Sequence, residues 1–201
     1  MKDGPNEKYY EASLRVIHLL KQPTKENPSL PDLIKEIVRE NKLGKKFMYR
    51  VAQRSYGLLN NFEPWKQVCK FESKALGEAL LQSGIVNIRH DLCANTTPQD
   101  NLVKWANEHI EHWHGQIKNC KPRLVVCGGT FHAVKQAIKQ TFKQALQPQE
   151  QVASTGMKWF IDPVVEGCIY IDAPHPTARY PVAMVYTYIM TSAREILKNS
   201  S

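Results

Sequence analysis

Apolar residues recur along this chain in two patterns, one with helical spacing and the other in short continuous runs. Helical spacing predicts helices over residues 9–20, 31–44, 47–59, 71–82, 99–119, 131–145 and 181–197. Short runs rich in β-branched residues predict strands over residues 85–88, 123–127, 157–162 and 168–172. Strands that alternate with helices indicate an α/β fold with a mostly parallel central sheet.

Length and composition indicate a single domain over residues 1–201. The chain has 201 residues, of which 42% are hydrophobic and 23% charged, as in ordinary globular proteins. No run approaches the roughly 20 apolar residues that span a bilayer, and the N-terminus lacks the apolar core of a secretory signal. We therefore expect a cytoplasmic, intracellular protein with no membrane partner.

The cysteines predict neither disulfides nor a metal centre. Their number is odd and no close pair occurs. Their positions are Cys69, Cys93, Cys120, Cys127 and Cys168. We interpret them as free, mostly buried thiols, and we expect no metal and no other cofactor.

The charge balance favours a polyanionic partner. The formal net charge is +8 and the isoelectric point is about 9.2, which suits nucleic acid because bound Lys and Arg release counterions from phosphates. Lys135, Lys139 and Lys143 repeat at helical spacing and can either contact phosphates or form a solvated helix face.

Three predicted strands end in residues suited to ligand binding. Asn87 ends one, Gly128 and Gly129 follow the second, and His175 lies between two prolines after the third. Ligand crevices of parallel sheets lie beyond these carboxyl ends. A histidine between prolines has little backbone freedom, so its ring can be aimed, and an amide such as Asn87 can read a pyrimidine edge. Each residue alone is also compatible with a purely structural role.

The same segments resemble the uracil-DNA glycosylase superfamily. CIYIDAPHPTARY (168–180) is similar to its C-terminal motif, in which a strand delivers His-Pro followed by a loop that inserts into DNA. RLVVCGG (123–129) looks like the preceding strand, and SGIVNI (83–88) looks like the strand that ends in the uracil-reading Asn. MYRVAQRSYGLLN (48–60) resembles a helix of a divergent, mostly microbial branch. The resemblance implies a three-layer α/β/α fold with a short, mostly parallel central sheet.

The resemblance also implies roles for individual residues. His175 would stabilise the departing uracil anion, and Asn87 would select the base. The loop residues Pro176, Thr177, Arg179 and Tyr180 would bind DNA, with Arg179 or Tyr180 filling the hole left by the flipped base. Phe131 can stack on the base or pack in the core, and Lys135 can contact phosphate. The implied partner is DNA, single- or double-stranded, bound by a monomer.

The chain departs from the family at its N-terminus. Family members begin their site with a strand whose loop carries an Asp or Asn that positions the attacking water. Here Asp3 is the candidate for this catalytic role, with Asn6 nearby, but no apolar strand precedes either. We therefore expect the domain to lack its first strand through truncation, an alternative start or evolutionary loss. Asp3 is equally interpretable as a solvated terminal charge.

Three functional readings follow from these observations. The first is a metal-independent DNA glycosylase, which excises uracil or a related base. The second is a catalytically silent relative that only binds nucleic acid. The third is an enzyme for a small phosphorylated ligand, built on Gly128, Gly129 and the next helix N-terminus. His109, His112 and His114 are interpreted as a polar helix surface and not as a metal site, because His114 points away from the other two.

Overall fold

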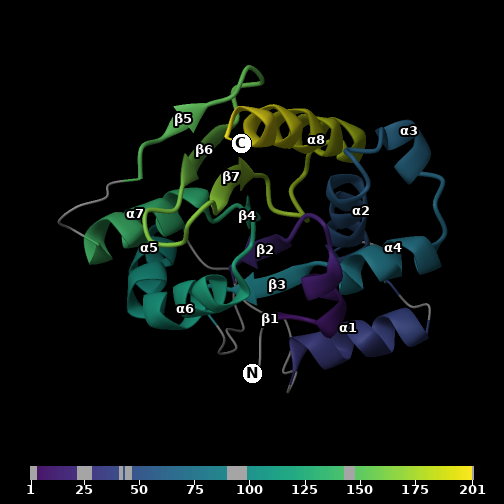
Figure 1. The fold of residues 1–201 in the computed structure, drawn as a ribbon, viewed down its shortest axis with the longest axis horizontal. Helices are drawn as coiled ribbons and strands as arrows, with labels where there is room; N and C mark the ends of the chain where they lie inside the picture. The colour runs from purple at the N-terminus through teal and green to yellow at the C-terminus, as the bar shows by residue number, and fades with distance from the viewer. Residues whose placement is uncertain are drawn as a thin grey trace.

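The computed structural model describes residues 4–21, 29–40, 43, 47–89, 99–142 and 148–200. Their strands form one seven-stranded sheet in the order β1-β3-β2-β4-β7-β6-β5 (Figure 1). The strands are β1 (Gly4–Pro5), β2 (Val16–Leu20), β3 (Gly84–Asn87), β4 (Leu124–Gly128), β5 (Gln151–Val152), β6 (Lys158–Ile161) and β7 (Ile169–Ala173). The central strands β3, β2, β4 and β7 are mutually parallel, whereas β1, β5 and β6 are antiparallel to their neighbours.

Helices cover both faces of this sheet and give it two hydrophobic cores (Figure 1). One face packs against α1 (Leu30–Arg39), α2 (Phe47–Leu59), α3 (Trp65–Val68), α4 (Ser73–Leu81) and α8 (Val182–Asn199). The opposite face packs against α5 (Gln99–Glu108), α6 (Ile110–Cys120) and α7 (Phe131–Thr141). The mixed α/β class with a mostly parallel sheet is confirmed, and the arrangement is compatible with three α/β/α layers.

One expected helix, over residues 9–20, is wrong. The structure has a short 3-10 helix, Glu7–Glu11, followed by β2, which lies in the middle of the sheet. Every residue of β2 is buried, because the two cores enclose it from both faces. A strand buried on both sides has no polar alternation, so its apolar positions also fit helical spacing.

The helix expected over residues 99–119 is two helices, α5 and α6, separated at His109. The indole Nε1 of Trp113 donates to the carbonyl of Ala106 at 2.9 Å, which satisfies a backbone acceptor at the break. The structure also corrects the interpretation of His114 as a surface residue. His114 is buried and its Nε2 lies 2.9 Å from Oδ2 of Asp162, so the polar group has a partner inside the core.

The other expected elements are present. Helix α2 has the predicted bounds, whereas α1 and α7 end at Arg39 and Thr141, five and four residues before their predicted ends. Four cysteines fall in the described residues and all are free thiols: Cys69 is exposed, whereas Cys120, Cys127 and Cys168 are buried. Cys93 lies outside the described residues.

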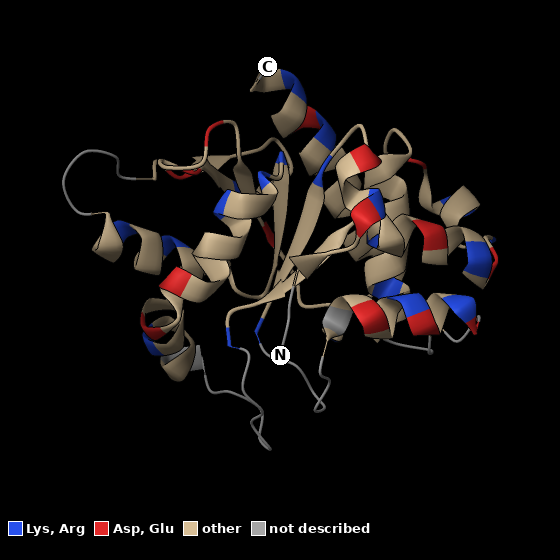
Figure 2. Ribbon diagram, turned by 60° about the horizontal axis from the view of Figure 1, so that its bottom comes forward, with Lys and Arg blue, Asp and Glu red and all other residues tan. Residues whose placement is uncertain are grey.

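Within the described part of the chain, no helix is both long and apolar enough to cross a membrane. Charges of both signs lie along α1, so this helix does not concentrate the positive charge (Figure 2).

We expect Gly57→Ala to destabilise the protein by about 1–3 kcal/mol through overpacking where α2 meets α8. A Cβ at Gly57 would lie 2.0 Å from Oη of Tyr186 and 2.6 Å from Sδ of Met190. The Tyr186 hydroxyl cannot retreat freely because it donates to the Glu63 carbonyl at 2.5 Å. Urea unfolding measures the change. Gly115→Ala in α6 is the control, because its Cβ meets nothing within 4 Å; equal stabilities for the two variants would contradict the packing argument.

Candidate functional site

The carboxyl ends of the four central strands meet at one edge of the sheet. Because these strands are parallel and in register, the chain leaves them at this edge after Asn87, Leu20, Gly128 and Ala173. The N–H of Gly129 donates to the Ala173 carbonyl at 2.8 Å, which joins the exits of β4 and β7. This is the edge at which parallel sheets bind ligands.

Gly129 permits close packing of three chain segments at this edge. Its φ of +70° favours glycine, and a Cβ there would lie 3.4 Å from Cβ of His175 and 3.8 Å from Cε of Lys21. The residue that follows β2 therefore lies close to the exits of β4 and β7. His175 and Lys21 are brought together although 154 positions separate them in the numbering (175 − 21).

The His175 ring is held in one orientation by the residues that follow it. Its Nδ1 accepts the backbone N–H of Thr177 at 3.2 Å and lies 2.8 Å from the Thr177 hydroxyl. A ring nitrogen that accepts an N–H carries no proton, so the neutral ring is protonated on Nε2. The phenyl ring of Phe47 from α2 stacks on the imidazole at a centroid distance of 5.9 Å. His175 therefore presents an Nε2–H donor.

Burial keeps this imidazole neutral. Loss of solvent lowers the pKa of His175 to about 4, and the positive charges of Lys21 and Arg54 add to the effect. At neutral pH the group is thus an uncharged donor near two positive charges, those of Lys21 and Arg54. Such a donor can stabilise negative charge that develops on a bound molecule.

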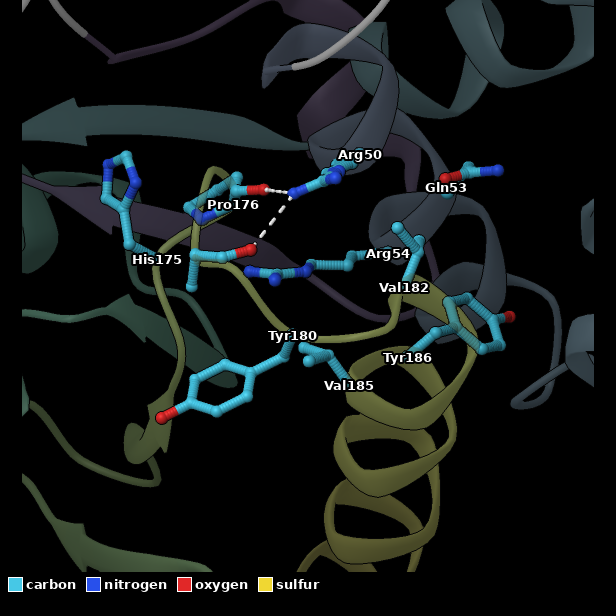
Figure 3. Close-up of a pocket in the computed structure, with 10 residues that line it drawn as sticks. Arg50, Gln53, Arg54, His175, Pro176, Tyr180, Val182, Val185 and Tyr186 are labelled. Carbon is cyan, nitrogen blue, oxygen red and sulfur yellow. Dashed lines mark hydrogen bonds between the residues drawn. The ribbon is translucent and has the colours of Figure 1, made fainter.

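Two arginines of α2 reach the loop that carries His175 (Figure 3). Nη1 of Arg50 donates to the carbonyls of Pro176 at 2.6 Å and Ala178 at 3.4 Å. Nη1 of Arg54 donates to the Pro174 carbonyl at 3.0 Å, and only 5% of Arg54 is exposed. Burial, and secondarily repulsion from Arg50, lowers the pKa of Arg54 to about 10, so the residue remains charged at pH 7.

A buried polar chain lies beneath these arginines. His18 of β2 has its Nε2 2.9 Å from Oγ of Ser55, whose Oγ is 2.9 Å from Oγ of Ser83. Ser83 in turn donates to the Leu80 carbonyl at 3.1 Å. Burial, followed by repulsion from Arg54, lowers the pKa of His18 to about 3. The interior below the site therefore contains a neutral histidine with a hydrogen-bond partner.

A small pocket opens between α2, the loop and the start of α8 (Figure 3). Its lining is Arg50, Gln53, Arg54, His175, Pro176, Ala178, Tyr180, Val182, Val185 and Tyr186, and none of these residues is acidic. Its cavity volume is about 10 Å³, which is room for about one water molecule. A nucleobase does not fit in this cavity as it stands.

Asn87 and Phe131 lie on opposite faces of the sheet. Side chains alternate along β3, so Asn87 shares the face of Ile85, which belongs to the α2 and α8 core. Phe131 belongs to the other core, where its ring packs 5.3 Å from the ring of Phe160. The structure therefore brings Asn87, and not Phe131, to the side on which α2 covers the sheet.

The remaining predicted site residues are distributed as follows. Pro176 is buried against the pocket, while Thr177, Arg179 and Tyr180 are exposed, with Tyr180 at 56%. The ammonium of Lys135 pairs with Glu150 at 2.5 Å, and Lys158 pairs with the same carboxylate at 3.2 Å, so the two lysines share one counter-ion. Asp3 lies outside the described residues, as does Lys143 of the predicted basic stripe.

Asn6 lies far from this edge along the sheet. Pro5 of β1 pairs with Gly84, the first residue of β3, and the chain then continues past that end. Asn6 is therefore at the opposite end of β3 from Asn87. Its side chain is buried, and its amide nitrogen and oxygen have no hydrogen-bond partner in the described structure.

Sequence reasoning gave no functional role to Lys21, His18, Arg50 or Arg54. The spacing of the two arginines, one turn apart in a largely apolar helix, was the available signal. No signal marked His18, because the strand that carries it was expected as a helix.

Comparison with known proteins does not identify the chain. No protein-family model matches it, and no curated protein matches it with significant similarity. The site must therefore be interpreted from its own geometry.

Proposed function

We propose that the protein is a DNA glycosylase of the uracil-DNA glycosylase type, which flips uracil or a related base out of DNA and hydrolyses its N-glycosidic bond. The observation that carries the proposal is the neutral, oriented His175 at the carboxyl edge of the sheet, with Lys21 and Arg54 close by. The helix layers on both faces of the central sheet are compatible with this fold.

The proposed chemistry stabilises an anionic leaving group. As the bond between C1′ of the sugar and N1 of uracil breaks, the electron pair moves onto the base and its carbonyl oxygens. The Nε2–H of His175 would donate to one of these oxygens without transferring its proton. The nearby positive charges of Lys21 and Arg54 favour the same anion, and water adds to C1′ with loss of a proton.

The other predicted residues have separate tasks. Asn87, near the end of β3 on the α2 side, would hydrogen-bond the polar edge of the base. Tyr180 is a large exposed side chain beside the pocket and would occupy the gap that the flipped base leaves in the stack. Arg179 is exposed and would contact the strand.

The second candidate function is a catalytically silent nucleic-acid-binding protein. It is favoured by the position of Asn6, which is at the wrong end of β3 to hold a water near His175. Residues 22–28, which follow β2 and Lys21 in the sequence, lie outside the described residues. Such a protein would bind DNA but release no base from it.

Excision assays distinguish the two functions. We expect the wild-type protein to release uracil from a labelled single-stranded oligonucleotide that contains one uracil, which alkali then cleaves at the abasic site. Asn87→Ala should reduce the rate about 10–100-fold, because one base-reading amide is lost. An oligonucleotide with thymine in place of uracil is the substrate control, and Asn107→Ala is the matched variant, because the Asn107 amide donates within its own helix, to the Val103 carbonyl at 2.8 Å.

The outcomes separate clearly. Release of uracil that depends on Asn87 supports the glycosylase with its assigned base contact. Salt-sensitive binding of the oligonucleotide with no uracil released, from a preparation shown to be folded by circular dichroism, would refute the enzyme and leave the silent binding protein.

A further inference from the structure

The pocket beside His175 contains more positive charge than the described protein neutralises. Arg50 and Arg54 approach the same loop, and no carboxylate among the described residues pairs with either. Arg54 is 95% buried, since its exposed fraction is 5%. A buried cation without a counter-ion is costly, and a second cation beside it raises that cost. The arrangement points to an anion that binds here.

Bracing of the loop does not account for both guanidiniums. The hydrogen bonds from these arginines to the loop carbonyls use only Nη1 of each side chain. A guanidinium has five N–H groups, and a single neutral carbonyl does not require a permanent charge. Within the described residues, Nη2 and Nε of both arginines therefore have donor capacity beyond these contacts, next to a pocket with no acidic lining residue.

The size of the pocket narrows the class of ligand. A cavity of about 10 Å³ has room for one water-sized group, such as a single anionic oxygen. The rest of the ligand must then remain outside, past Tyr180. A phosphodiester of an extended strand meets this requirement, because one unesterified oxygen can enter while the sugars and bases pass over the exposed loop.

We propose that Arg50 and Arg54 bind a backbone phosphate of a nucleic-acid strand, in the pocket between α2 and residues 174–180. The inference rests on the proposed function in one respect, that the partner is a nucleic acid. It adds a phosphate site that guides the strand past His175, with Tyr180 at its rim. Arg50 and Arg54 act as backbone-binding residues, and Arg54 contributes to the bond-breaking step only through its positive charge, as proposed above.

The test measures binding of a fluorescent single-stranded oligonucleotide that contains no uracil, over a range of salt concentrations. We expect Arg50→Gln to weaken binding about tenfold near 0.1 M salt. It should also reduce the slope of log K against log salt by about 0.7, the value for one phosphate contact to a single strand. Arg54→Gln should act in the same direction. Each variant is first checked for folding by circular dichroism, and Arg50→Gln alone decides if Arg54→Gln does not fold.

Arg194→Gln is the matched control. Arg194 is an exposed arginine of α8 that also donates to backbone carbonyls, those of Asn61 and Phe62 at 3.3 Å. The Arg194→Gln substitution removes the same charge and the same kind of contact, but away from the pocket. We expect its binding slope to equal that of the wild type. Equal slopes for Arg50→Gln and Arg194→Gln would overturn the phosphate site.

A second arm identifies the source of the anion. Replacing one phosphodiester at a time with a neutral methylphosphonate should weaken wild-type binding at one linkage, and Arg50→Gln should show no further loss there. The nucleic-acid assignment would be overturned if binding of inorganic phosphate or polyglutamate depended on Arg50 while binding of the oligonucleotide did not.

Failure of this inference is distinguishable from failure of the enzyme. Binding that depends on Arg50 in a protein that releases no uracil supports the phosphate site and refutes the glycosylase. Release of uracil by a protein whose Arg50 and Arg54 variants bind with unchanged slopes supports the glycosylase and overturns the phosphate site.

Discussion

His175→Ala is expected to slow release of uracil by about 10²–10³-fold at pH 7.5, the usual cost of losing one positioned donor to a developing oxyanion. The Nε2–H of His175 is oriented because Nδ1 accepts the N–H of Thr177. Alanine removes the donor without adding volume to the edge of the sheet. Single-turnover excision with saturating protein measures the chemical step, so a change in DNA affinity does not enter the result.

The dependence on pH tests the protonation state assigned to this histidine. Since the pKa of His175 is lowered to about 4, the ring is already neutral at pH 5 and gains no proton between pH 8 and pH 5. The single-turnover rate should therefore not rise as the pH is lowered through about 6.5. Such an increase, absent from His175→Ala, would mean that His175 donates a full proton as a cation. His132→Ala, at an exposed position of α7, is the control for loss of a histidine elsewhere.

The parts of the fold that could be predicted are those whose pattern has one interpretation. Helix α2 has apolar residues at helical spacing, and β4 ends at Gly128 with Gly129 directly after it, a pair that a helix would not favour. By contrast, β2 is enclosed by both cores, so its five buried residues fit either a strand or a buried helix. The choice between them depends on pairing with β3 and β4, which are far away in the sequence.

The same distinction explains which parts of the site were predicted. His175 was identifiable because two adjacent prolines restrict it locally, whatever surrounds it. The proximity of Arg54 to the His175 loop depends on how α2 packs across the sheet, and they are 120 residues apart at their point of contact. Lys21 is near His175 only because β2 is parallel to β4 and β7. Tertiary contacts of this kind leave no local pattern in a single sequence.

The second large effect is expected from His18, whose burial should make the folded protein sensitive to acid. In the unfolded chain a histidine has a pKa of about 6.5, whereas burial in β2 lowers the pKa of His18 to about 3. The unfolded state therefore binds more protons between these values. The free energy of unfolding is therefore unaffected by His18 above about pH 6.5 and decreases as the pH falls below that value. Below about pH 3, where His18 is protonated in both states, it causes no further decrease.

The magnitude follows from the width of that window. Each pH unit costs about 1.4 kcal/mol while the unfolded state alone is protonated, so the loss from His18 at pH 4.5 is about 3 kcal/mol. We expect His18→Gln to be moderately less stable at pH 7.5, because its hydrogen bond to Ser55 is altered. From pH 7.5 to pH 4.5, however, the variant should lose about 3 kcal/mol less than the wild type. Urea unfolding at both pH values gives this difference.

The comparison assigns the acid sensitivity to the interior beneath the site. His132→Gln, which also removes one histidine but at an exposed position, should lose as much stability on acidification as the wild type. Arg54→Gln should reduce the loss, because the positive charge of Arg54 contributes to the low pKa of His18. An identical loss for wild type and His18→Gln would show that His18 is protonated in the fold, and that β2, α2 and the buried serines do not enclose a neutral imidazole.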